Sequence, residues 1–404
     1  FGSSHLIQGP SALCSTILYY CIGIMLRALV LLIFTTAVRA LIFLKGEKGQ
    51  DEEYNVDLYN TEAWKVDINL DLPPEERWND VVHDHHPQLV SMATACTGIF
   101  ELYTNTHGPG SLNRWFKATH VPEVYKREMQ GIVKAVNNAN FTYECLLLNQ
   151  LFYETGFQVA CSGVLVAMPN GTVIHGRNAD WSHEYGGTAA GALDVTFTRG
   201  GKPLYKAAMN LASIGIHSAM SFGGWSFEQN TRHEGLNPDT NLLWAEKGGE
   251  AFMFMTRQAF DEGLSYAEAL ERFASTKWNS PQYFIIAGAG PYEGAIITVD
   301  PALSYQNVEV LNPNTRRIMY QLNSDAWLKP SEDRDQTFLK FESSLEKHRV
   351  EINADTVWNL ITTPPVYNDG NLYSFVAIPA TGYWKHIVHP EGTLAEARGL
   401  TSKA

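Results

Sequence analysis

Residues 161–180 read CSGVLVAMPNGTVIHGRNAD and form the most informative stretch of the chain. An apolar first half leads to PNG at 169–171, which has the composition of a turn, and the alternation of a strand then resumes. The pattern predicts a hairpin whose first strand begins at Cys161. Because the second strand folds back beside the first, we expect Arg177 and Asp180 to return close to this cysteine.

Cys161 is the candidate nucleophile, although a lone cysteine at the start of an apolar strand is more often a small buried side chain. A thiol attacks a carbonyl well only as the thiolate, so it needs a base or a lowered pKa. A cysteine that begins a chain carries its own base, the free α-amine, which titrates near pH ~8 in model peptides. This chemistry requires a cut before Cys161, and the nearby Arg177 and Asp180 favour it over the structural interpretation.

The hexapeptide HGRNAD at 175–180 resembles the His-Gly-Arg-Asn-x-Asp signature that follows a cysteine and a hairpin in one branch of the N-terminal-nucleophile hydrolases. This branch is the family of acid ceramidase and N-acylethanolamine-hydrolysing acid amidase. Three more segments are similar to elements of that family, at 66–78, at 322–327 together with 332–334, and at 365–368. The resemblance therefore extends over most of the chain beyond about residue 66.

The resemblance implies an α+β fold, the αββα sandwich of N-terminal-nucleophile hydrolases with a helical N-terminal subunit. It also implies that the precursor cuts itself. The Cys161 thiol attacks the Ala160 carbonyl, an acyl shift gives a thioester, and water releases the new terminus. Residues 46–160 then become a helical α-subunit and residues 161–404 a catalytic β-subunit, and the two products remain together as a heterodimer.

The resemblance also assigns roles to the catalytic residues. Asp180 accepts hydrogen bonds from the α-amine and thiol of Cys161, and Arg177 orients Asp180 and favours the thiolate through its positive charge. Asn323 donates its side-chain amide to the developing oxyanion, and Arg334 packs behind Asn323. The alternative for each of these polar residues is a surface salt bridge or a loop cap.

The residues that would choose the substrate match the family less well. Glu228 is an approximate counterpart of an acidic residue that the relatives place just before an arginine, so we expect it to bind substrate; a solvated surface glutamate is the alternative. Residues 212–215 read ASIG where the relatives carry a Gly-Tyr-Val-Gly turn. The short interval between Asp180 and the strand at Leu193 looks more like the acylethanolamine enzyme, whereas residues 70–74 look more like the ceramidase.

The first 45 residues have the composition of a leader. Residues 17–44 are strongly apolar, but Arg27 and Arg39 interrupt them and leave an uncharged run at 28–38. That run is shorter than the ~20 residues of a membrane span and suits the core of a signal peptide. A signal anchor or a buried helix is the alternative. Either kind of signal would direct the chain into the secretory pathway, so we expect a lysosomal or secreted protein.

Cysteine usage fits one reactive thiol. Two of the five cysteines fall in the leader, which leaves Cys96, Cys145 and Cys161. An odd count is consistent with one free thiol, and a disulfide between Cys96 and Cys145 is one arrangement, although spacing alone does not support it. Asn140 and Asn170 begin glycosylation sequons, of which only exposed ones would be used.

Charge and polar clusters limit the partners and cofactors. The 404 residues carry a formal net charge of −13 without a basic cluster, which argues against a nucleic-acid partner. A lipid substrate and a membrane or micelle surface are the expected partners. HDHH at 83–86 is reminiscent of a metal cluster, but neighbouring residues on a loop point in different directions, so a solvated polar turn is the better interpretation. We expect no metal and no other cofactor.

Periodicity predicts a helical piece followed by a sheet-rich piece. Apolar residues recur at helical spacing over 86–154 and again over 251–273. Strand patterns follow Cys161 at 192–197, 204–208, 283–287, 294–299 and 317–322, with a turn at 199–202 between the first two. This order suits a sheet sandwich covered by helices.

Two classes of function stay open on the sequence. The first is an amidohydrolase that cleaves the amide bond of fatty acyl amides, a ceramide or an N-acylethanolamine, to free fatty acid and amine. The helices at 86–154 would then line a groove for the acyl chain. The second is a lipid-binding or self-processing protein without turnover, and a small-amide acylase of the same fold is a further alternative. The combination of Cys161, Arg177, Asp180 and Asn323 favours the amidohydrolase.

Overall fold

The fold comes from a computed structural model that describes residues 61–156, 160–180, 191–303, 306–327, 333–347 and 351–390. Contacts divide the chain into two units, Phe1–Tyr54 and Asn55–Ala404, and the described residues all belong to the second unit. The expected leader, its two cysteines and Glu332 of the family-like segment lie outside the described residues. Across the described ranges, no helix is long and apolar enough to cross a membrane.

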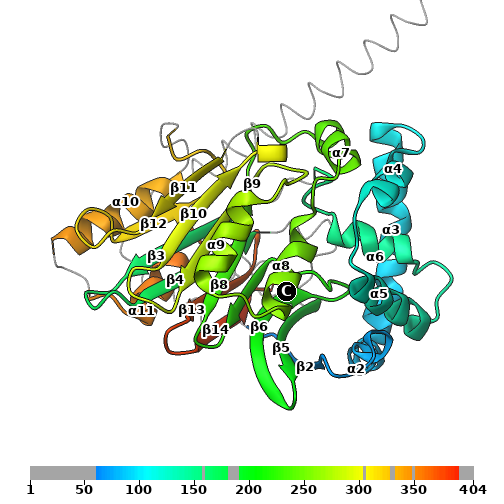
Figure 1. Cartoon of the computed structure of the whole chain (residues 1–404), viewed down its shortest axis with the longest axis horizontal. Helices are drawn as coiled ribbons and strands as arrows, with labels where there is room; N and C mark the ends of the chain where they lie inside the picture. The colour runs from blue at the N-terminus through cyan, green and yellow to red at the C-terminus, as the bar shows by residue number, and fades with distance from the viewer. Residues whose placement is uncertain are drawn as a thin grey trace, which may run out of the picture. The chain divides into compact units, whose positions relative to one another are not determined.

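Two sheets form the centre of the described part of the chain (Figure 1). The six-stranded sheet has the order β1 (Thr61–Glu62), β14 (Tyr383–Val388), β13 (Asn371–Ile378), β4 (Val173–Asp180), β3 (Cys161–Ala167) and β12 (Ile318–Gln321). The eight-stranded sheet has the order β11 (Gln306–Val310), β10 (Gly294–Val299), β9 (Gln282–Gly288), β8 (Trp225–Thr231), β7 (Ser218–Ser221), β6 (Lys202–Asn210), β5 (Ala192–Arg199) and β2 (Trp64–Asn69). The strand pairs are antiparallel except β2 with β5, which is parallel.

The two sheets pack face to face and carry helices on their outer faces, so the expected αββα sandwich is confirmed (Figure 1). Between the sheets, Leu165 of β3 belongs to the same apolar cluster as Tyr283 of β9. On the outer face of the six-stranded sheet, Val164 and Ile174 cluster with Val357 of a covering helix. The helices that follow Cys161 are α7 (Pro238–Glu246), α8 (Phe252–Asp261), α9 (Tyr266–Ser275), α10 (Asp333–Glu346) and α11 (Ala354–Ile361). Because both faces are covered, every residue of the two hairpin strands β3 and β4 is buried.

The helices that precede Cys161 lie together beside the sandwich (Figure 1). They are α2 (Asn79–Asp84), α3 (His86–His107), α4 (Ser111–Ala118), α5 (Glu123–Val136) and α6 (Tyr143–Gln150), which confirms the helical piece predicted for 86–154. A disulfide joins Cys96 of α3 to Cys145 of α6, with 5.9 Å between the Cα atoms, the arrangement that the odd cysteine count left open. The wholly buried Trp115 donates a hydrogen bond of 2.8 Å to the Tyr103 hydroxyl, which fixes α4 against α3.

Two short strands before Cys161 are built into the sandwich. β1 pairs with β14 at one edge of the six-stranded sheet, and β2 pairs with β5 at one edge of the eight-stranded sheet. A buried ion-pair network also connects the helical piece to the sandwich. Glu128 Oε1 of α5 accepts hydrogen bonds from Arg77 Nη1 at 2.8 Å and from Arg257 Nη2 of α8 at 3.3 Å. The residues before Cys161 therefore form part of both sheets.

The predicted hairpin is confirmed as β3 and β4, with Cys161 opposite Ala179 and Gly163 opposite Arg177. Gly171 in the turn has a φ of 90°, a left-handed conformation that glycine adopts without strain. Side chains alternate between the two faces of a strand, so Cys161, Gly163 and Arg177 all face the eight-stranded sheet. The register therefore brings the arginine to the same face as the thiol.

The helical pattern at 251–273 gives two helices, α8 and α9, instead of one. Gly263 has a φ of 69° and ends the first of them. Ser265 then begins α9 with a capping box, in which its side chain and that of Glu268 each accept from the other's backbone N–H. Both signals are local, and the spacing of apolar residues alone does not show where the first helix ends and the second begins.

Strands β1, β2, β7, β8, β11, β13 and β14 were not predicted from the sequence, and β8 shows why. Every residue of β8 is buried, although Ser226, Glu228, Gln229 and Asn230 are polar. A strand pattern based on apolar alternation misses such a segment. Two of these side chains, Ser226 and Glu228, lie against the hairpin that carries Cys161.

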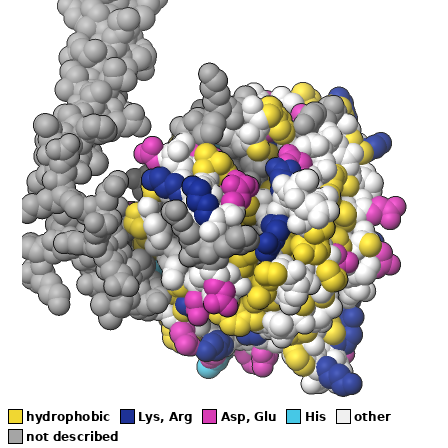
Figure 2. Space-filling view, turned by 90° about the vertical axis from the view of Figure 1, so that its left-hand side faces the viewer, with side chains coloured by type: hydrophobic (Ala, Val, Ile, Leu, Met, Phe, Trp, Pro, Cys, Tyr) yellow, Lys and Arg dark blue, Asp and Glu magenta, His cyan; other side chains and the backbone are white. Residues whose placement is uncertain are grey.

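The exposed surface carries charges of both signs. On the face shown in Figure 2, basic and acidic side chains lie among apolar ones, and neither sign gathers in a large patch of the visible atoms. The formal net charge of −13 therefore remains the argument against a nucleic-acid partner.

Candidate active site

Arg177 contacts the sulfur of Cys161 and is itself held firmly. Its Nη2 donates to Cys161 Sγ at 3.4 Å and to the Gln229 carbonyl at 2.8 Å. Its Nη1 donates to the His217 carbonyl and to Ser218 Oγ, both at 2.5 Å. Strands β7 and β8 thus fix the guanidinium of β4 against the thiol, as expected for an arginine that favours the thiolate.

Asn323 holds the backbone nitrogen of Cys161. Its Oδ1 accepts from the Cys161 N–H at 2.8 Å, and its Nδ2 donates to the Thr231 carbonyl at 2.8 Å. Asn323 is wholly buried just beyond β12, the strand that pairs with β3. The structure therefore directs the side-chain oxygen toward the nucleophile, and the expected donation to an oxyanion stays a prediction.

Asp180 lies at the end of β4 and holds the residue before the nucleophile through its backbone. Its N–H donates to the Ala160 carbonyl at 3.0 Å. Its carboxylate accepts from Asn368 Nδ2 at 3.2 Å and from Asn371 Nδ2. We expected Arg177 to orient Asp180, but an odd separation along a strand directs the two side chains to opposite faces. The two asparagines and Arg334 contact this carboxylate directly, and the charge of Arg177 still lowers its pKa.

Arg334, in the first turn of α10, reaches three members of the site. Its Nη1 donates to the Cys161 carbonyl at 3.1 Å and to Asp180 Oδ2 at 3.3 Å, and its Nη2 donates to Asn323 Oδ1 at 3.4 Å. The side chains of the Arg334–Asp180 ion pair are only 12% and 6% exposed, so this pair is no surface salt bridge. The structure thus brings Arg334 beside Asn323, as expected, and into contact with the nucleophile as well.

Burial and charge act in opposite directions on the ionisation of the site. Burial raises the pKa of the Cys161 thiol, and the positive charge of Arg177 lowers it. Burial likewise raises the pKa of the Asp180 carboxyl, against Arg334, Asn368 and Asn371, which favour the carboxylate. In the uncut chain the thiol therefore needs a further base before it can attack.

Glu228 lies on β8 between the two sheets and is wholly buried, so the alternative of a solvated surface glutamate is wrong. Its Oε2 lies 3.5 Å from His175 Nε2 and 3.8 Å from Arg177 Nε. The residue directly before Arg232 is Thr231, whose carbonyl receives the hydrogen bond from Asn323. A contact between Glu228 and substrate stays a prediction.

Sequence reasoning assigned no role to several residues around Arg177 and Asp180. The Tyr373 hydroxyl lies 2.7 Å from Ser218 Oγ and 3.0 Å from His217 Nδ1, and the Arg177 guanidinium lies 5.9 Å from the centre of the Tyr373 ring. Asn368 ends one of the family-like segments, which is a signal that could have pointed to it. The polar residues of β7 and β13 carry no such signal.

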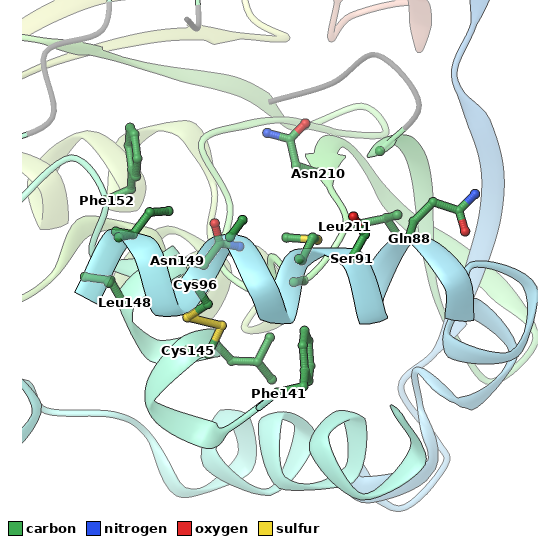
Figure 3. A pocket seen from close by; sticks show the side chains of 16 residues that line it. Gln88, Ser91, Cys96, Phe141, Cys145, Leu148, Asn149, Phe152, Asn210 and Leu211 are labelled. Atoms are coloured by element: carbon green, nitrogen blue, oxygen red, sulfur yellow. A yellow bond between two sulfur atoms is a disulfide. The ribbon is translucent and has the colours of Figure 1, made fainter. Parts of the chain in front are cut away.

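An apolar pocket of about 270 Å³ lies between the helices before Cys161 and the end of β6 (Figure 3). The Cys96–Cys145 disulfide forms part of its wall. The wall residues come from α3, α6 and their surroundings: Gln88, Ser91, Met92, Ala95, Cys96, Ile99, Phe141, Cys145, Leu146, Leu148, Asn149, Phe152, Gly191, Asn210, Leu211 and Ala212. Phe152 thus lines the pocket, and the next residue, Tyr153, lies near the thiol. Burial raises the pKa of Tyr153 well above its usual value, and the Cys161 charge raises it further.

The HDHH segment spans two helices in the structure. His83 and Asp84 end α2 and His86 begins α3. Within the described ranges, no group of three or more His, Cys, Asp or Glu side chains is placed to hold a metal ion.

Comparisons with known proteins agree with the motifs. The model of the beta subunit of N-acylethanolamine-hydrolyzing acid amidase matches residues 62–118. N-acylethanolamine-hydrolyzing acid amidase of Caenorhabditis elegans is 26% identical over 325 residues, which cover 78% of this chain and 88% of the relative. Acid ceramidase of Homo sapiens is 26% identical over 331 residues, with coverage of 76% and 81%.

A solved structure is also similar. The ortholog of N-acylethanolamine-hydrolyzing acid amidase from Caenorhabditis elegans has 25% sequence identity and a TM-score of 0.48, and the match covers 55% of this chain and 93% of that one. The sequence relatives and the motifs around Cys161 agree with each other. In sequence and in motifs, the chain is similar to N-acylethanolamine-hydrolyzing acid amidase and to acid ceramidase.

Proposed function

We propose that this protein is an amidohydrolase that cleaves the amide bond of fatty acyl amides, with Cys161 as the nucleophile after the chain has cut itself before Cys161. One observation carries the proposal: three separate groups hold the atoms of the Ala160–Cys161 peptide. Arg177 contacts Sγ, Asn323 Oδ1 accepts from the nitrogen, and the Asp180 N–H donates to the Ala160 carbonyl.

These contacts support a self-cleavage step. Attack of Sγ on the Ala160 carbonyl carbon moves negative charge onto the Ala160 oxygen, where the Asp180 N–H stabilises it. Collapse of the intermediate breaks the C–N bond, and the Cys161 nitrogen takes the thiol proton and becomes an amine. Water then hydrolyses the thioester and leaves a carboxylate on Ala160 and a free α-amine on Cys161.

The same groups support turnover of an external amide. The α-amine of Cys161 takes the thiol proton, and Arg177 favours the resulting thiolate. The thiolate attacks the substrate carbonyl, the amine leaves with a proton from the α-amine, and water hydrolyses the acyl-enzyme. Asn323 would donate to the oxyanion in this cycle, and Asp180 and Arg334 would hold the new terminus. A contact between Glu228 and the substrate is not needed for any of these steps.

The pocket supports a long acyl chain as the part of the substrate that is recognised. The wall of the pocket is mostly apolar and includes Phe152. The next residue in the sequence, Tyr153, lies near the Cys161 thiol. Each methylene that enters such a pocket contributes up to ~0.8 kcal/mol to binding. This argument favours a fatty amide, an N-acylethanolamine or a ceramide, over the small amides of an acylase.

A protein that processes itself without turnover is the second candidate. Cys161 is only 1% exposed, which favours a thiol that reacts with its own chain and not with a ligand. Incubation with a mixed panel of fatty amides at acidic pH, followed by mass spectrometry of the products, separates the two candidates. Free fatty acid that is absent with Cys161→Ala supports the amidohydrolase, and self-cleavage without any product supports the second candidate.

Passage through the secretory pathway is part of the proposal. Asn140 and Asn170 are both exposed, and the disulfide between Cys96 and Cys145 is of a kind that persists in oxidising compartments. A lysosomal or secreted enzyme would therefore carry glycans on these sequons. Loss of mass on glycosidase treatment of protein from eukaryotic cells, and its absence in an Asn140→Gln and Asn170→Gln double variant, tests this expectation.

A further inference from the structure

Glu228 places a carboxylate between the sheets, against the strand that begins with the nucleophile. Its side chain leaves β8 toward β3 and meets Gly163, two residues beyond Cys161. A Cβ atom at Gly163 would lie 1.4 Å from Glu228 Oε1, so only glycine leaves room for this carboxylate. The thiol, the glycine and the carboxylate therefore share one face of the hairpin.

The carboxylate faces two basic groups of β4. His175 Nε2 is 3.5 Å and Arg177 Nε is 3.8 Å from Glu228 Oε2, and all of these side chains are wholly buried. In the described structure both Glu228 oxygens, His175 Nε2 and Arg177 Nε make no hydrogen bond of good geometry. The other titratable group whose charge reaches Glu228 is Tyr373 on β13. Ser226 Oγ, at 2.8 Å, fixes the far side of the His175 ring.

The Glu228–His175 pair holds either one proton or none, and the difference reaches the thiol through Arg177. With one proton, the pair is neutral overall and the charge of Arg177 is uncompensated. Without it, the pair is negative and compensates Arg177. Because Arg177 Nη2 lies 3.4 Å from Cys161 Sγ, the protonated pair favours the thiolate and the deprotonated pair opposes it.

We propose that Glu228 is a positioning residue that acts through Arg177, so that proton uptake by the buried Glu228–His175 pair strengthens the positive charge facing Cys161 and favours the thiolate. This inference rests on the proposed function, since it concerns the same nucleophile. Burial raises the pKa of Glu228, while His175 and Arg177 lower it. The raised pKa means that the carboxyl takes up its proton at a higher pH than an exposed glutamate does, and the protonated pair holds the pKa of the thiol lower than the ionised pair does.

Glu228→Gln tests the proposal because glutamine has the shape of the protonated carboxyl and cannot ionise. The measurement is the ultraviolet absorbance of the thiolate against pH, taken as the difference from a Cys161→Ala protein. We expect the titration midpoint of Cys161 to fall by about one pH unit in Glu228→Gln, a tenfold larger thiolate fraction below the midpoint. A midpoint equal to that of the unchanged protein overturns the proposal.

Two further variants serve as controls. Glu154→Gln also removes a wholly buried carboxyl, whose pKa burial raises to about 7, but this carboxyl accepts from the Phe252 N–H, so the midpoint should stay in place. An equal shift in both glutamine variants would mean a general effect of burial and would overturn the proposal. His175→Gln keeps the carboxylate, which is already ionised where the thiol titrates, so the midpoint should stay close to that of the unchanged protein. A midpoint that falls as far as in Glu228→Gln would mean that any disturbance of the pair moves the thiol, and would overturn the proposal.

The readout requires no substrate, so it separates this inference from the proposed function. A protein that hydrolyses no fatty amide but shows a lowered midpoint in Glu228→Gln and none in His175→Gln would retain the coupling and lose the proposed activity. Hydrolysis of fatty amides with unmoved midpoints would retain the activity and reject the coupling. In an active protein, the acidic limb of kcat/KM, on which activity rises with pH, should move with the thiol midpoint.

Discussion

Asn323→Ala should impair both folding and turnover, by amounts that follow from its two buried hydrogen bonds. The substitution leaves the Cys161 N–H and the Thr231 carbonyl without their partner inside the protein. Each unsatisfied buried group costs about 1–3 kcal/mol, so the free energy of unfolding should fall by about 2–4 kcal/mol. Turnover should fall by about 10²-fold or more, or at least ~2.7 kcal/mol, if Asn323 also donates to the oxyanion.

The two effects are measured on different backgrounds. Denaturant unfolding is compared in a Cys161→Ala chain, which we expect to stay uncut, and kcat/KM is compared in processed protein. Asn323→Asp keeps an oxygen toward the Cys161 nitrogen and removes only Nδ2, so it should lose turnover as the alanine variant does. Asn230→Ala is the matched control, because Asn230 is also wholly buried and donates to the Gln321 carbonyl at 2.9 Å. A folded, processed Asn323→Ala protein with kcat/KM within a few fold of the unchanged enzyme would refute the assignment.

Three more predictions concern maturation, substrate and the pocket. Acid treatment of the purified protein should give two chains, the second beginning at Cys161, while Cys161→Ala stays whole; full activity in a preparation that amino-terminal sequencing shows to be uncut contradicts this. With one fixed amine and saturated acyl chains below their aggregation threshold, kcat/KM should climb by up to ~0.8 kcal/mol per methylene and then level off. A flat series, or a preference for the shortest chain, counts against a fatty amide. Replacing Cys96 and Cys145 by serine should lower the unfolding free energy by about 4 kcal/mol, because the disulfide spans 49 residues, and should weaken the dependence on acyl length. Unchanged stability in chemical denaturation would show that α3 and α6 do not depend on the disulfide.

The hairpin was predictable because its signals are local. Turn residues at 169–171 and strand-like residues on either side specify β3 and β4 within twenty residues, and the return of Arg177 to Cys161 follows from the antiparallel register. The orientation of the Asp180 side chain was harder to predict from the sequence. It depends on Asn368 and Asn371, which lie far along the chain and reach β4 only through the pairing of β13.

The buried position of Glu228 could not be predicted from sequence for a different reason. A strand with the sequence WSFEQNT is neither apolar nor regularly alternating, so its burial depends on what the opposite sheet offers. Gly163, His175 and Arg177 supply that environment from strands more than fifty residues away in the chain. Polar residues inside a sandwich are recognisable only after the two sheets are known to meet.

Because β1 pairs with one sheet and β2 with the other, a cut before Cys161 would change how the protein can refold. A single chain folds at a rate that does not depend on its concentration. Once the chain is cut, the piece that begins at Cys161 would alone expose two unpaired sheet edges, at β14 and at β5, and restoring both edges would need the two pieces to meet. Denaturation that is reversible for the precursor would then become dependent on protein concentration for the product. After the cut, the native structure would persist mainly because it unfolds slowly, and not because the separated pieces refold readily.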